Sequence, residues 1–218
     1  MLAAAVLSAS TAHAQSAAAA VSRFELGIGA RWVGGEALGA RTATETTGAG
    51  GSSTLFSTST ELAGRGGVDG RVGVRVSRSL VAEIEGSYLK PQLRVAISGD
   101  AEGAPAVTAT ETIQQFTIGG NVLWRLPGRR WSTRFAPFAI VGGGYLRQLH
   151  DQATLVETGR FYQAGGGVTA LLSSRRHFHT RGIGIRADMR VLIRTGGVAL
   201  DDGSMVAPAA GLSLFARF

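Results

Sequence analysis

Two histidines and two glutamates have the spacing that first suggests chemistry. His177 and His179 stand two residues apart and could bind a metal ion through their imidazoles, but the sequence has no cysteine and no carboxylate beside them to complete a site. Glu83 and Glu85 could act as a paired acid and base. They alternate with apolar residues among many arginines, so ion pairing explains them better. We predict no catalytic residue, no metal site and no cofactor.

An enzyme acting on membrane lipid would need a nucleophile and a base at one rim of the molecule. His150 is the histidine placed at the predicted outer rim. Ser52, Ser53 and Ser57 can reach that rim only if the segment that holds them folds back. The segment 182–187 fits a loose G-x-G-x-x-A pattern, but it opens no helix, and a nucleotide site needs one. A lipid-modifying enzyme is therefore kept as an alternative.

The elements that position these residues are strands, because apolar residues recur at every second position from residue 22 onward. One face of each segment carries Val, Ile, Leu and aromatic residues, and the other carries charged or small polar residues. The predicted strands cover about 22–34, 62–76, 80–97, 110–126, 135–149, 158–173, 181–194 and 206–218. In the fifth strand the apolar face is assigned to Phe138, Ile140 and Leu146, opposite Tyr145 and Arg147.

The charged face is predicted to line a filled interior. In the predicted strands 62–76 and 80–97 the apolar face is assigned to even-numbered residues. Directly paired residues on these two strands must share a face of the sheet, so their residue numbers must add to an even sum. If Val76 pairs with Leu80, Arg71 lies opposite Glu85, within about 5 Å at Cβ, and Arg75 lies diagonal to Glu83. The predicted interior ion-pair network comprises Arg71, Arg75, Glu83, Glu85, Arg186, Asp188 and Arg190.

The connections differ in length and charge at the two ends. Three short ones, 77–79, 127–134 and 174–180, carry arginine and no acid, and Arg181 follows the last of them. Three long ones, 36–60, 98–108 and 195–205, are rich in small residues, and the short segment 150–157 lies at the same end. That end carries the acids Glu36, Glu45, Asp100, Glu102, Asp151, Glu157, Asp201 and Asp202. Basic turns suit inner-leaflet phosphates, and the acidic loops could recruit divalent cations.

Aromatic residues of the apolar face sort to the strand ends. Such rows are typical of the two interfaces of a membrane barrel, and a soluble barrel gives no reason for them. The predicted outer row holds Trp32, Tyr88, Phe116 and Tyr162, and the inner row holds Phe24, Trp124, Phe138 and Phe218.

The start of the chain and its composition limit location and partners. Residues 1–14 end in Ala12-His13-Ala14, which is typical of a signal-peptide cleavage site. We expect a signal peptide at 1–14, a short segment at 15–21 and a barrel at 22–218. No apolar run is long enough for a membrane-spanning helix. The net charge of +7 is scattered along the chain, so nucleic acid is not a predicted partner.

The segment from Pro137 to Tyr145 and the ending Leu-Ser-Leu-Phe-Ala-Arg-Phe218 resemble the small outer-membrane β-barrel proteins of the OmpA/OmpX-like and opacity-protein group. The resemblance implies an eight-stranded antiparallel barrel in the outer membrane of a Gram-negative bacterium, surrounded by its lipids. It also implies that the barrel-insertion machinery reads the C-terminal strand ending in Phe218.

We expect a non-enzymatic integral protein that supports the envelope or interacts through its surface loops. The alternatives are a narrow pore, the lipid-modifying enzyme and a soluble secreted binding barrel.

Overall fold

The computed structural model describes residues 23–46, 48, 50–126, 135–150, 155–173, 182–198 and 203–218. Regular structure in these ranges consists of β-strands arranged in two antiparallel sheets. None of the described residues belongs to a helix long and apolar enough to cross a membrane. The predicted signal peptide at 1–14 and the segment 15–21 lie outside the described residues.

Eight strands close into a barrel in the order β1-β12-β11-β10-β9-β8-β5-β4. Closure results because β1 pairs with β12 on one side and with β4 on the other. A closed sheet has no free edge, so its backbone donors and acceptors are paired within the barrel. The barrel strands are β1 (Phe24–Val33), β4 (Arg65–Arg75), β5 (Leu80–Leu89), β8 (Gln114–Arg125), β9 (Phe135–Leu149), β10 (Val156–Ser173), β11 (Gly182–Gly196) and β12 (Met205–Arg217).

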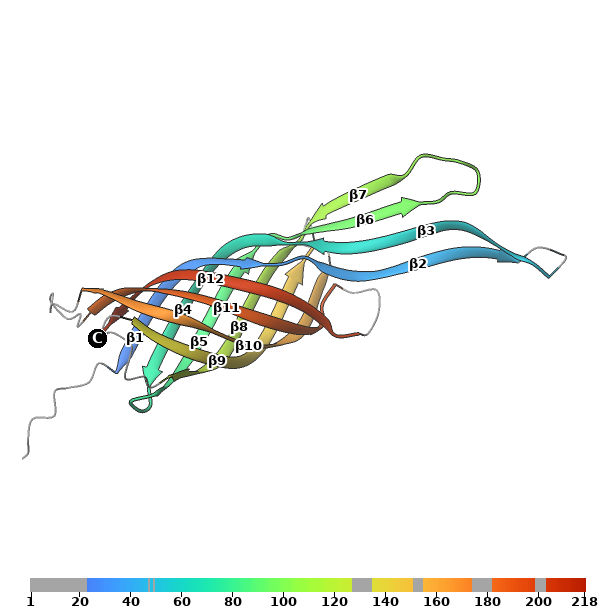
Figure 1. Cartoon of the computed structure of the whole chain (residues 1–218). Coiled ribbons are helices and arrows are strands. Elements are labelled where there is room, and N and C mark those ends of the chain that lie inside the picture. Colours follow the sequence, from blue (N-terminus) through green and yellow to red (C-terminus); the bar gives the residue numbers. More distant parts are fainter. Residues whose placement is uncertain are drawn as a thin grey trace, which may run out of the picture.

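Four further strands form a second sheet, here called the protruding sheet, in the order β2-β3-β6-β7. They are β2 (Glu36–Thr46), β3 (Ser52–Ala63), β6 (Gln92–Ser98) and β7 (Val107–Thr112). Each continues one of the neighbouring barrel strands β1, β4, β5 and β8, so half of the barrel wall extends beyond the rim. Figure 1 shows this sheet projecting from the end opposite the C-terminus, with the β2–β3 hairpin reaching farther than β6 and β7. We call the two ends of the barrel the sheet end and the terminus end.

The chain passes between barrel and protruding sheet at short breaks in strand pairing. Gly34 and Gly35 separate β1 from β2, Gly64 separates β3 from β4, and Pro91, which has no backbone N–H, precedes β6. A Cβ added at Gly64 would lie 2.9 Å from the backbone nitrogen of Gly35. Glycine is therefore required where these two crossings approach each other.

The predicted eight-stranded antiparallel barrel is confirmed, and so is the inward or outward direction of most side chains. The fifth predicted strand is the exception. Phe138, Ile140 and Leu146 are each 3% exposed and point into the barrel, whereas Tyr145 is 63% exposed on its outside. The assignment failed because β9 is apolar on both faces, and Gly142, Gly143 and Gly144 leave no polar contrast at its middle.

The predicted loops were also wrong in part. Segment 36–60 contains β2 and most of β3, and the predicted strands 80–97 and 110–126 are each divided at the rim, into β5 and β6 and into β7 and β8. β2 and β3 lack the clear alternation of the barrel strands, because Thr and Ser occupy both faces of their outer halves, where most residues are exposed. The turn at 77–79 is confirmed by the bond from Val76 N to Leu80 O at 3.0 Å. The turns at 127–134 and 174–180 lie outside the described residues.

Candidate functional site

A layer of charged side chains crosses the middle of the barrel interior. Glu83 and Glu85 point into it from β5, and Arg186, Asp188 and Arg190 point into it from β11. None of the five is more than 7% exposed. Each set occupies alternate positions of one strand, which directs the side chains to the same side of the sheet.

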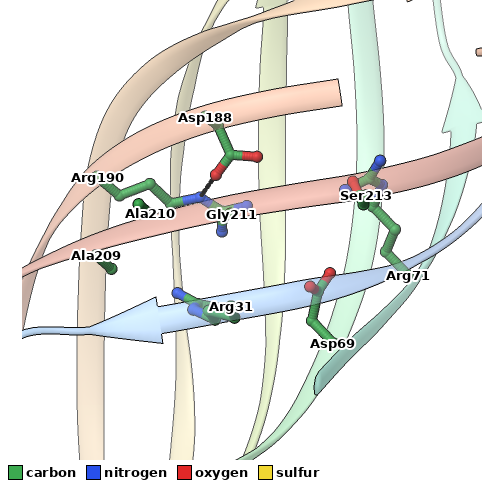
Figure 2. A pocket seen from close by; sticks show the side chains of 9 residues that line it. All are labelled: Arg31, Asp69, Arg71, Asp188, Arg190, Ala209, Ala210, Gly211 and Ser213. Atoms are coloured by element: carbon green, nitrogen blue, oxygen red, sulfur yellow. Dashed lines mark hydrogen bonds and ion pairs between the residues drawn. The ribbon is translucent and has the colours of Figure 1, made fainter. Parts of the chain in front are cut away.

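Two of the arginines of β11, Arg186 and Arg190, bridge the carboxylates of this layer. Arg186 donates to Glu83 at 2.8 Å and to Asp188 at 3.1 Å. Arg190 donates to Glu85 at 2.7 Å and to Asp188 at 2.6 Å. Asp188 thus accepts from both arginines, and Figure 2 shows its contact with Arg190. Glu83, Glu85 and Asp188 each have a cationic partner, which burial of charge requires.

The predicted register of β4 and β5 is confirmed, since Arg71 lies opposite Glu85. The ion-pair partners nevertheless differ from those that register suggests. Arg71 Nε lies 3.7 Å from Glu83, while Glu85 binds Arg190 and also Arg31 of β1. In a narrow barrel a side chain reaches strands across the interior as easily as the neighbouring strand, so register does not determine the partner.

Arg75 lies apart from this layer. It lines a small cavity at the terminus end with Glu25, Arg125 and Arg217. Glu25 accepts from Arg217 at 2.9 Å and from Arg125 at 3.3 Å. Arg75 is diagonal to Glu83 in the strand register, as predicted, but it belongs to this second group of charges.

Apolar layers lie on both sides of the central charges. Val81, Leu123, Phe138 and Ile140 pack together toward the terminus end. Toward the sheet end the packed cluster consists of Val33, Leu89, Leu146, Phe161, Leu192, Ala207 and Ala209. Sequence reasoning missed both layers. Val81 and Leu89 are nevertheless separated from Glu83 and Glu85 by even numbers of residues on the same strand, so all four side chains must point the same way.

Little space remains in the interior. Three cavities lined by described residues have volumes of about 10, 10 and 20 Å³. Each is about large enough for one water molecule. Figure 2 shows the cavity between Arg31, Asp69 and Arg190, in the charged layer.

The protruding sheet is fixed to the barrel mouth by a polar contact and an apolar core. Glu36, at the start of β2, pairs with Arg194 of β11 at 2.5 Å. Above this pair, Leu38, Leu62, Ile113, Val198 and Met205 form a buried cluster, here called the sheet core. Glu36 was predicted in an acidic loop, but it is 7% exposed, because it lies at the barrel mouth against Arg194.

His150 provides a further contact between the two sheets. It directly follows β9 at the rim. Its Nδ1 lies 2.9 Å from Glu111 of β7, and its Nε2 lies 3.8 Å from Glu157 of β10. Glu111 of β7 pairs with Leu93 of β6, and Leu93 pairs with Leu62 of β3, so Glu111 and Leu62 lie at the same height in the sheet. Ser57 is five residues farther along β3, about 17 Å at the rise of a strand. The structure does not bring this histidine and the candidate serines together.

Metal sites are not found among the residues that the structure describes, where no group of three or more His, Asp or Glu side chains could hold an ion. His177 and His179 lie outside those residues, as do Asp151, Asp201 and Asp202. Cation binding by the acidic loops stays a prediction.

Aromatic residues lie mostly where the sequence predicts them. Phe24, Trp32, Phe116, Trp124 and Tyr162 are 44–56% exposed on the outside of the barrel. The ring of Tyr88 lies 4.7 Å from that of Phe116, and Phe218 donates its backbone N–H to Phe24 at 2.9 Å.

Phe138 is wrong as a member of these rows, because it is buried in the interior. Phe135 and Tyr145, also on β9, are 52% and 63% exposed on the outside. Phe135 and Tyr145 are an even number of residues apart and so share a face of β9. Alternation would have placed both rings outside if Phe138, Ile140 and Leu146 had been assigned to the interior.

A match to a protein family agrees with this architecture. The model of the family described as "Outer membrane protein beta-barrel domain" matches residues 2–205. Among solved structures, the attachment invasion locus protein Ail of Yersinia pestis is similar at 10% identity, over 90% of this chain and 99% of that one, with a TM-score of 0.40. The outer-membrane protease OmpT of Escherichia coli is similar at 9% identity, over 90% and 97%, with a TM-score of 0.32. No curated protein matches the chain.

The closed barrel has an apolar outside and a polar middle within, as a bilayer requires of a barrel that crosses it. With the family match over residues 2–205, this shows that the chain belongs to the outer-membrane β-barrel proteins and resides in the outer membrane of a Gram-negative bacterium.

Proposed function

We propose that this protein is a cell-surface binding protein, in which the barrel is the membrane anchor and the protruding sheet contacts partners outside the cell. The observation that carries the proposal is the protruding sheet itself. Four barrel strands continue into it, and its own buried core attaches it to the rim. A connection with no role beyond linking barrel strands would need only a few residues.

The packing of the interior favours an anchor over a pore. A conducting path would have to cross two apolar layers and a charged layer in which Arg186 pairs with Glu83 and Arg190 pairs with Glu85. The cavities there have room for about one water molecule each. We therefore expect no conductance in planar bilayers.

The contacts at the rim favour binding over catalysis. His150 contacts two glutamates, and the serines that might serve as nucleophile lie on the distant half of β3. Hydrolysis of lipid would need a nucleophile within hydrogen-bond reach of a base. We propose a role without catalysis.

The orientation in the membrane follows the usual arrangement, with short turns in the periplasm and long extensions outside. We propose that the protruding sheet is extracellular and that the terminus end faces the periplasm. Protease added to intact cells should then cut within 36–60 and spare 127–134. The reverse pattern would contradict this orientation.

Assembly is proposed to depend on the last strand. β12 pairs with both β1 and β11, and it ends next to Phe218. We propose that the barrel-insertion machinery reads this strand, so deletion of Phe218 should reduce the amount of heat-modifiable protein in the outer membrane.

The test of function removes the far half of the β2–β3 hairpin. Ala40 pairs with Ser59, so residues 41–58 can be replaced by Asn-Gly, which forms a tight hairpin turn, while the sheet core stays intact. Outer-membrane vesicles with full-length or trimmed protein are offered four surfaces. These are plain lipid vesicles, vesicles containing lipopolysaccharide, beads coated with extracellular-matrix protein, and vesicles carrying the same protein.

Full-length protein should be captured at least tenfold more than trimmed protein by one of these surfaces or more. Heat-modifiability on gels shows that the trimmed barrel is folded. Equal capture of both proteins by all four surfaces would overturn the proposed function.

A further inference from the structure

The outer half of β2, residues Ala40–Thr46, is an edge strand. β2 is the first strand of the protruding sheet, and in the described part of the chain β3 is the strand that pairs with it. Of these seven residues, all but Ala43 are exposed. An edge strand presents a row of backbone N–H and C=O groups that can pair with another strand.

The opposite edge of the protruding sheet, strand β7, is shorter and lies closer to the barrel. β7 has six residues and ends at the rim, and Glu111 near that end contacts His150. It carries the same five residues, Thr-Ala-Thr-Glu-Thr, at 108–112 that β2 carries at 42–46. The two edges thus share a local sequence and differ in position, which provides an internal control.

We propose that the outer half of β2 pairs antiparallel with the same segment of a second copy of this protein. This inference rests on the proposed function and names its partner. The segment reads Ala40-Arg41-Thr42-Ala43-Thr44-Glu45-Thr46, with a cation and an anion each two positions from Ala43. Such a strand is complementary to itself when it is turned end for end.

One register brings the opposite charges together. When Ala43 pairs with Ala43 of the second copy, Arg41 faces the second copy's Glu45 and Thr42 faces its Thr44. Both interactions then occur twice, because the pairing is symmetric. Opposite charges and Thr–Thr pairs directly across a sheet stabilise strand pairing.

The neighbouring registers lack these contacts. A shift of two residues places Glu45 opposite Ala43 in one direction and opposite Gly39 in the other. A shift of one residue would place opposite faces of the strand together, which the pleat disfavours. The charge pattern therefore selects pairing centred on Ala43.

The symmetry of the pairing also sets the arrangement of the two barrels. Two identical strands pair antiparallel about a two-fold axis perpendicular to the strand. Because β2 runs away from its barrel (Figure 1), the second barrel must lie beyond the far end of the hairpin. The two copies therefore sit in facing membranes, and the pairing joins one cell or vesicle to another.

The hairpin has the reach that this contact needs. β6 pairs with β3 from Ala63 as far as Ser57, whereas β2 continues alongside β3 as far as Thr46, opposite Ser52. Residues 43–46 of β2 thus extend, together with β3, past the last residue of β3 that pairs with β6, and this end of the hairpin meets a facing membrane first.

The first test uses charge reversal in outer-membrane vesicles that display the protein in its native orientation. Vesicles with wild-type protein should cluster, and Arg41→Glu or Glu45→Arg should each reduce clustering at least tenfold, because like charges then face each other. Mixing the two kinds of variant vesicle should restore clustering, since every facing pair again has opposite signs. Wild-type vesicles that do not cluster, or mixed variants that stay dispersed, would overturn the inference.

The second test uses cysteine cross-linking, which the absence of cysteine from the chain makes specific. Ala43→Cys should give an oxidised dimer that joins two separately labelled vesicle populations. Ala109→Cys, which has the same neighbours on β7, is the matched control and should give little dimer. Equal yields from both positions would mean random collision and would refute the pairing.

The two proposals fail in different ways. If trimming residues 41–58 abolishes capture by lipid or by matrix protein while Arg41→Glu has no effect on clustering, the protein binds a different partner and this inference is wrong. If trimming changes nothing on any surface, the proposed function is wrong as well.

Discussion

Four neighbouring barrel strands continue into the protruding sheet, yet the barrel and the protruding sheet differ in how their charged side chains are buried. Within the barrel, Glu85 and Arg190 form an ion pair with 3% and 5% of their side chains exposed. In the protruding sheet, Glu61 and Arg94 form one of similar chemistry with 58% and 48% exposed. The difference in exposure shows that a strand in a membrane must bury its charged side chains in the barrel interior, whereas a strand in water can leave them exposed.

A bilayer fixes the sidedness of each barrel strand. The outside must be apolar to face lipid, and polar groups must find protein partners in the interior because the cavities there leave room for little water. A sheet in water has no such constraint on either face, so Thr and Ser can occupy both. Buried contacts thus stabilise the barrel, whereas the protruding sheet depends on its small core at the rim.

The largest effect should come from emptying an apolar layer of the barrel. Phe161→Ala should reduce the free energy of unfolding by about 4 kcal/mol, because a 3% exposed ring leaves a cavity. Urea unfolding in detergent micelles measures it. Phe116→Ala, on the lipid-facing side, should cost clearly less. Equal losses would mean that the interior is not tightly packed.

Removing a buried charge should have the next largest effect. Glu85→Gln leaves Arg31 and Arg190 without their shared carboxylate, at a cost of about 3 kcal/mol. Arg71→Gln should cost less, since Glu83 keeps its 2.8 Å contact with Arg186. The same unfolding assay compares them, and two near-zero losses would indicate a wet interior.

A core substitution at the rim should loosen the protruding sheet and leave the barrel intact. Leu62→Ala removes a 6% exposed side chain from the sheet core and should destabilise the protruding sheet by about 2 kcal/mol. Limited proteolysis should then cut β2 or β3 faster, while heat-modifiability of the barrel stays unchanged. Loss of barrel folding would show that the two regions are one cooperative unit.

The smallest effect is expected from the exposed ion pair. Glu61→Gln should change stability by less than about 0.5 kcal/mol, because water solvates Arg94 once its partner is lost. Glu85→Gln is the same chemical change inside the barrel and serves as its counterpart. Similar losses for both would remove the contrast between the two regions.

Sequence reasoning succeeded where the membrane constrains the chain. The facing of most barrel strands and the Arg71–Glu85 register follow from alternation and from one turn at 77–79. It failed at β9, which is apolar on both faces, and in β2 and β3, where Thr and Ser give no alternation to detect. These failures have one cause, since a period of two is visible only when the two faces meet different surroundings.

The sequence by itself determined that the chain forms a barrel with a charged middle, because residues two apart must share a face. Tertiary structure decided which charges meet. Glu85 joins Arg31 and Arg190 across the interior because closure brings β1, β5 and β11 within reach, and spacing along the chain does not encode that distance. Closure also placed apolar layers above and below the charges, and the continuation of four adjacent strands past the rim turned predicted loops into a second sheet.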